Sequence, residues 1–182
     1  MTIQLITAPA VPAVSMADAR LAVKADDTEL DSAIAIAIAG ITAHVQHDTG
    51  RSIINQTWRI TLDSFPDAIK LFNPPIVSVS WVKYYDADNV LQTLDPADYT
   101  VDSVSEPGYV VPAVDVEWPE TYDKINAVQV QYVAGYGATD ASTPDDIKMY
   151  ILAKLAEQFD ADAKANPFLD SLLQSKKIWS IG

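Results

Sequence analysis

Residues 56–85 contain two stretches in which apolar and polar residues alternate, and this alternation constrains the fold more than any other feature. In the first stretch Trp58, Ile60 and Leu62 alternate with polar residues, the period of a β-strand with one buried face. Two consecutive prolines precede the second stretch, Ile76–Tyr85, and proline is tolerated at the start of a strand but not in its middle. This region therefore predicts at least two half-buried strands.

The β pattern continues to about residue 134 as short apolar stretches separated by turn sequences. The turns are Asp86-Ala87-Asp88-Asn89, Asp95-Pro96 and Glu106-Pro107-Gly108, and the last strand is predicted at Val128–Val133. About seven short strands with frequent turns are typical of an antiparallel sandwich or a small barrel.

Helical patterns flank this β region. Ser15 followed by Asp18 is a variant capping box that predicts a short helix to about Val23. A second helix is predicted from Thr28 to Thr49, with Gly50 as its terminator.

After the β region, Thr143 is predicted to cap a helix that has Pro144 at its first position and ends near Asp160. The fold class is therefore α+β: a small helical bundle of N-terminal helices plus a C-terminal helix, with an inserted antiparallel β-sandwich or barrel-like module. The expected parts are an N-terminal helical part at 1–52, the inserted β-module at 53–134, the C-terminal helix at 135–166 and a tail at 167–182.

The long second helix has two distinct apolar faces. Its core stripe is predicted to be Leu30, Ile34, Ile38, Ile41 and Val45. The opposite face carries the candidate interface residues Ile36, Gly40 and Ala43, and small residues around one isoleucine permit close packing of another helix. That helix is either the C-terminal helix of the same chain or a neighbouring subunit. The C-terminal helix is apolar on two sides, and Met149, Leu152 and Ala156 are its candidate interface residues.

Composition excludes several classes of function. A net charge of −13 repels nucleic-acid phosphate, so sequence-specific DNA or RNA binding is not expected. The absence of cysteine excludes disulfides, thiolate zinc sites and cysteine nucleophiles. The apolar first sixteen residues contain no basic residue before their apolar part and are interrupted by two prolines, so neither a signal peptide nor a membrane span is expected.

No catalytic, cofactor or metal site is predicted. His44 and His47 are the only histidines, and a metal site needs three or four ligands. Asp86-x-Asp88-Asn89 begins like a calcium loop but lacks the later ligands, and it is better interpreted as a hairpin turn. Gly135-x-Gly137 lacks the remaining residues of a nucleotide-binding loop. One alternative function is a binding module for carbohydrate or peptide, with an aromatic platform of Trp118, Tyr122 and Tyr136.

The tail after Asn166-Pro167 combines large apolar residues with two adjacent lysines. Its candidate docking residues are Phe168, Leu172, Leu173, Lys176, Lys177 and Trp179. About two helical turns are not stable alone, so the segment must dock on something. The favoured interpretation is docking outside the chain, on a neighbouring subunit or another partner, with Trp179 as the anchor; the alternative is docking on the chain's own core.

The sequence also resembles a known family in several ordered blocks. These are S-M-A-D-A-R-L-A-V, T-G-R at Thr49, W-R-I-T-L-D-S-F-P, N-P-P-I-V-S-V, Y-D-A-D, E-P-G, W-P, A-V-Q-V-Q-Y-V-A-G-Y-G, T-P-D-D-I-K and L-L-Q-S-K-K-I-W-S. In order and spacing they resemble the head–tail connectors of tailed bacteriophages, also called head-completion adaptors. The resemblance covers nearly the whole chain, but Lys176-Lys177 replaces an aromatic–arginine pair that is more usual.

The resemblance implies a structural virion protein at the head–tail junction and not an enzyme. Such proteins assemble as a ring, typically dodecameric, beneath the portal, and receive the tail or a tail-side completion protein. DNA would pass through the channel without sequence-specific binding, and the chain would be synthesised in the bacterial cytoplasm. The implied partners are further copies of the chain, the portal protein, on which the tail at 167–182 would dock, and the tail-side completion protein, with no cofactor and no membrane.

Overall fold

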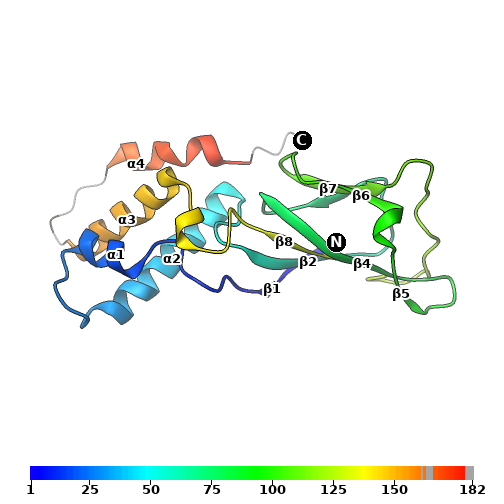
Figure 1. Cartoon of the computed structure of the whole chain (residues 1–182), viewed down its shortest axis with the longest axis horizontal. Helices are drawn as coiled ribbons and strands as arrows, with labels where there is room; N and C mark the ends of the chain where they lie inside the picture. The colour runs from blue at the N-terminus through cyan, green and yellow to red at the C-terminus, as the bar shows by residue number, and fades with distance from the viewer. Residues whose placement is uncertain (161, 163–165, 179–182) are drawn as a thin grey trace. The chain divides into compact units, whose positions relative to one another are not determined.

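The computed structural model describes residues 1–160, 162 and 166–178, and divides the chain into two compact units (Figure 1). The β-unit consists of Met1–Ala8 and Asn55–Gly135. The helical unit consists of Pro9–Ile54 and Tyr136–Gly182. Helices and antiparallel sheets are thus segregated, which confirms the predicted α+β class.

The β-unit contains two antiparallel sheets. The larger has the order β1 (Thr2–Thr7), β2 (Gln56–Leu62), β8 (Val128–Ala134), β4 (Ile76–Tyr85), β5 (Leu91–Thr93), and the smaller has the order β3 (Ile69–Leu71), β7 (Gly108–Pro112), β6 (Tyr99–Asp102). A short 3₁₀ turn, Pro96–Asp98, lies between β5 and β6. All residues of these strands are described, and they form two open sheets with one shared core. The β-unit is therefore a sandwich and not a barrel.

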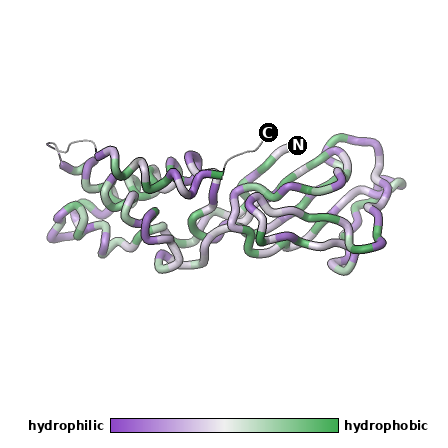
Figure 2. The backbone as a smooth tube through the Cα atoms, turned by 90° about the horizontal axis from the view of Figure 1, so that it is seen from above, coloured by the Kyte–Doolittle hydropathy of each residue, from purple (hydrophilic) through white to green (hydrophobic). Residues whose placement is uncertain are grey.

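The alternation of apolar residues determines which face of each strand is buried. Along β8 the residues alternate strictly between buried and half-buried. Figure 2 shows hydrophobic and hydrophilic residues interspersed along the backbone. Ile60, Val82 and Val130 from the larger sheet share a core with Val110 from the smaller one. Tyr132 is fully buried in this core, and its hydroxyl donates to the Phe72 carbonyl oxygen at 3.0 Å. Burial raises the pKa of this phenol.

The N-terminus differs from the prediction. The first eight residues belong to the β-unit, and not to an N-terminal helical part at 1–52. β1 pairs with β2 in antiparallel register, Ile3 opposite Ile60, and Ile3 packs on the sandwich core. The backbone pairing and this one apolar contact decide the placement, because the other side chains of the strand are exposed.

The helical unit is built from α1 (Met16–Val23), α2 (Asp31–Thr49), α3 (Asp145–Phe159) and α4 (Pro167–Leu172), with 3₁₀ turns at Asp140–Ser142 and Gln174–Lys176. The core residues of α2 are Ile34, Ala37, Ile38 and Val45. Those of α3 are Ile147, Tyr150, Ile151 and Leu155, which lie on one of the two sides predicted to be apolar. The predicted core position Leu30 is wrong: it precedes the helix and is 42% exposed, because α2 begins three residues later than the sequence pattern suggests.

The helix ends follow local signals in most cases. The Ser15 hydroxyl accepts from the Asp18 amide at 3.0 Å, and Gly50 ends α2 with a left-handed φ of 70°. Arg20 on α1 pairs with Asp31 at the start of α2, which joins the two helices. Thr143 is not the predicted cap of α3. Its hydroxyl instead donates to the Ala13 carbonyl oxygen at 2.7 Å, because this buried donor needs a partner inside the unit.

Candidate assembly surfaces

The face of α2 that the helical spacing places opposite the core is exposed. Ile36 is 74% exposed, and Gly40 and Ala43 are exposed beside it. A Cβ built on Gly40 would meet no atom within 4 Å, so packing inside the chain does not require a glycine there. The helix has no Asp, Glu, Lys or Arg between Asp31 and Asp48. This face is thus rich in small and apolar residues and carries no Asp, Glu, Lys or Arg.

The chain's own C-terminal helix does not cover this face, so that alternative is wrong for the described residues. α2 and α3 instead leave an open groove of about 640 Å³ between them. Ile36, Gly40 and His44 lie on the α2 side of the groove, and Tyr150 and Lys154 on the α3 side. A contact between Ile36 and a neighbouring subunit stays a prediction.

The three candidate residues on α3 are not all exposed with Ile36. Met149 is 44% exposed, whereas Leu152 and Ala156 are half-buried. Leu152 packs on the helical core, and Ala156 lines a hollow that also involves Val23 of α1. The six candidate interface residues therefore do not form one continuous exposed face, and a subunit contact at α3 remains a prediction only for Met149.

The tail packs on the helical unit itself. Leu169 and Leu173 are buried in the helical core, with exposed fractions of 5% and 2%, and Leu172 packs against the same core. Phe168 is 58% exposed, because it lies on the outer side of α4. The expectation that Leu172 and Leu173 dock elsewhere is thus corrected, since the nearest apolar surface is the chain's own.

Polar contacts hold the end of the tail on the same unit. Lys176 Nζ lies 3.2 Å from the Asp146 carboxylate, and Lys177 Nζ lies 3.1 Å from that of Asp48. Arg51 Nε donates to the Lys176 carbonyl oxygen at 2.6 Å. Both predicted docking lysines are therefore paired within the chain. Trp179, the predicted anchor, lies outside the described residues.

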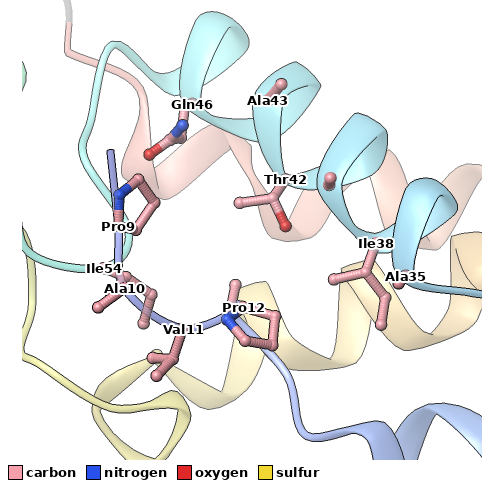
Figure 3. Close-up of a pocket in the computed structure, with 12 residues that line it drawn as sticks. Pro9, Ala10, Val11, Pro12, Ala35, Ile38, Thr42, Ala43, Gln46 and Ile54 are labelled. Atoms are coloured by element: carbon pink, nitrogen blue, oxygen red, sulfur yellow. The ribbon is translucent and has the colours of Figure 1, made fainter. Parts of the chain in front are cut away.

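An apolar cavity of about 330 Å³ lies between α2 and the segment that follows β1. Figure 3 shows Pro9 and Pro12 of this segment opposite Thr42 and Gln46 of α2. The buried Thr42 hydroxyl has no hydrogen-bond partner among the described residues. Alanine, proline and isoleucine provide most of the remaining lining, which contains no titratable side chain that could activate the Thr42 hydroxyl.

The sequence elements weighed as chemical sites have structural roles. The Asp86 carboxylate accepts from the Val90 amide at 2.9 Å and from the Gln92 side chain at 2.6 Å, which lowers its pKa and builds the β4–β5 hairpin turn. At Gly137 an added Cβ would lie 2.2 Å from the Ser142 hydroxyl, so this glycine is needed for a close turn. Among the described residues, no three His, Asp or Glu side chains gather as a metal site would require.

Trp118 and Tyr136 of the predicted aromatic platform pack in different units. Trp118 stacks on Phe65 with ring centroids 4.6 Å apart, and its Nε1 donates to the Pro66 carbonyl oxygen at 2.7 Å. Tyr136 packs against the core of the helical unit. The structure therefore gives no support to a carbohydrate or peptide platform built from these residues. Within the part of the chain that the structure describes, no helix has the length and hydropathy to span a membrane.

Comparisons with known proteins agree with the fold expected from the resemblance. No family model and no curated protein matches the chain. Among solved structures, a chain in the neck of the empty gene transfer agent particle, with C6 symmetry, matches at a TM-score of 0.83 and 20% identity, over 100% of this chain and 97% of that one. A chain in the virion of the native particle matches at a TM-score of 0.78 and 19% identity, over 100% and 97% of the two chains. A chain in the neck of the native particle, with C12 symmetry, matches at a TM-score of 0.75 and 20% identity, over 100% and 97% of the two chains. The whole chain, and not one module of it, therefore has the fold of a protein found in the neck of a phage-like particle.

Proposed function

We propose that this protein is a structural head–tail connector, which forms a ring beneath the portal of a tailed phage or phage-like particle. The observation that carries the proposal is the match over the full length of both chains to a component of a symmetric particle neck. The ring extends the DNA channel at the head–tail junction and receives the tail or a tail-side completion protein. DNA passes without sequence-specific contacts. The net charge of −13 repels its phosphates and so disfavours adhesion of the DNA to the ring.

Two features of the helical unit support a role in assembly. The uncharged face of α2 leaves Ile36 exposed, and Gly40 allows the backbone of a neighbouring element to approach closely. A closed ring repeats one head-to-tail contact between neighbours, so each subunit needs two complementary surfaces. The α2 face, with the groove that Ile36 lines, is a candidate for one of them. No reaction is proposed, because the described residues of the two units do not gather a set of groups that would perform one.

Electron microscopy of the purified chain, alone and mixed with its portal protein, tests the proposal. We expect rings with sixfold or twelvefold symmetry, at least in the presence of the portal, in agreement with the symmetries of the matched necks. Ile36→Glu should abolish the rings without lowering the melting temperature, because the side chain is exposed. Ile125→Glu is the matched control, since Ile125 is 75% exposed in a loop of the β-unit. Absence of rings under both conditions for the unsubstituted chain would overturn the proposed function.

A further inference from the structure

The outer face of the five-stranded sheet has a composition that the rest of this acidic chain does not share. The strand register arranges its residues in three rows across the sheet, and we call these rows the sheet face. They are Thr7, Thr57, Val133 and Ser78; Gln4, Arg59, Gln131 and Trp81; and Thr2, Thr61, Gln129, Lys83 and Thr93. The chain has 25 Asp and Glu residues, yet none lies in these five strands, all of which are described.

At the centre of the sheet face, the aromatic ring of Trp81 lies close to two cations, Arg59 and Lys83. The Arg59 guanidinium carbon lies 5.2 Å from the centre of the Trp81 ring, and Lys83 Nζ lies 4.9 Å from it. The guanidinium also donates to the Gln131 amide oxygen at 2.9 Å, which fixes its position. The two positive charges are therefore held in place beside a large half-buried apolar ring, and ordering them on binding costs little entropy.

A polar hollow of about 290 Å³ adjoins Arg59 on the side of β1 and β2. Its lining includes Gln4, Thr61 and Gln129, which can accept or donate hydrogen bonds. The Arg59 Nε atom is buried and has no hydrogen-bond partner among the described residues. A carboxylate oxygen is a suitable acceptor for such a group.

We propose that the sheet face is a docking surface for an acidic surface of a second copy of this chain. This proposal deepens the proposed function and rests on it. In a ring the contact is head to tail, so two different surfaces of the chain must complement each other. A sheet without acidic residues, which presents Arg59 and Lys83, complements a chain whose net charge is −13.

The composition favours a protein surface over nucleic acid as the occupant. Trp and Arg are enriched at the centres of protein interfaces, whereas acidic residues are depleted there. Two cations are few for binding to a phosphate backbone, and the net charge of the chain opposes it. The Thr and Gln residues around Trp81 are neutral and can form hydrogen bonds. In an interface, a rim of such residues excludes water from the central residues.

Sedimentation of the full chain over a concentration series, at low and high salt, tests the proposal. We expect self-association that salt weakens, and that the double variant Arg59→Glu, Lys83→Glu weakens at least about tenfold. Trp81→Ala should weaken it as well. Lys70→Glu is the matched control, because Lys70 Nζ also lies beside an aromatic ring, 5.2 Å from the centre of Phe72, but in the smaller sheet. The milder variant Arg59→Gln, Lys83→Gln is used if the first one melts at a lower temperature.

Each outcome supports or overturns the inference. Equal association of the wild type and both double variants, or a wild type that remains monomeric throughout, overturns self-docking through the sheet face. Rings observed with the portal in either case leave the proposed function intact. Binding of a short DNA duplex at low salt that the double variant loses would assign the sheet face to phosphate, and would also overturn the proposal.

Discussion

Leu173→Ala should destabilise the chain strongly, because the C-terminal segment is part of the helical core. Leu173 is only 2% exposed and lies in one cluster with residues of α1, α2 and α3. Substitution of a buried leucine by alanine costs about 2–5 kcal/mol. The C-terminal segment can partly relax into the cavity that the substitution leaves, so we expect the free energy of unfolding to fall by about 3 kcal/mol. For a chain of this length that corresponds to a fall of about 6–12 °C in melting temperature.

Phe168→Ala is the matched control, because Phe168 lies five residues earlier in the same segment and is 58% exposed. It should lower the stability by less than about 1 kcal/mol. Thermal and urea unfolding followed by circular dichroism measure both variants. A chain that ends at Asn166 should melt lower than the Leu173 variant, since it also loses Leu169 and the Arg51 hydrogen bond. Equal melting of wild type and Leu173→Ala would refute the packing of this segment on its own unit.

Three further predictions concern single positions. Gly40→Ala should raise the unfolding free energy by about 1 kcal/mol, measured in urea, because alanine favours a helix and the added Cβ meets nothing. Tyr132→Phe should lower it by about 1 kcal/mol, since the part-buried hydrogen bond to the Phe72 carbonyl oxygen is lost. Hydrogen bonds from Arg20 and from the Val90 amide lower the pKa values of Asp31 and Asp86, respectively. The unfolded chain therefore binds these protons at higher pH, so stability present above about pH 4 should be lost as the pH falls through the folded values, and melting over a pH series should detect it.

The sequence by itself determined the class of fold and most of its elements. Alternation along residues 56–62 and 128–134 required strands with one buried face, because a side chain can reach only one of two sides of a sheet. Capping at Ser15 and the left-handed Gly50 fixed helix ends through local contacts. Helical geometry alone placed Ile36 on the face of α2 opposite the core, whereas the exposure of that face was decided by the tertiary structure.

Tertiary structure alone decided the features that depend on distant partners. The first eight residues join the sheet because β2 offers a free edge, and this edge is made about fifty residues later in the chain. The tail folds onto its own helices because Asp48, Arg51 and Asp146 come to lie beside it. The sheet face escaped sequence analysis for the same reason. Arg59, Trp81 and Gln131 meet only through the pairing of three strands, and no local pattern encodes a register between residues so far apart.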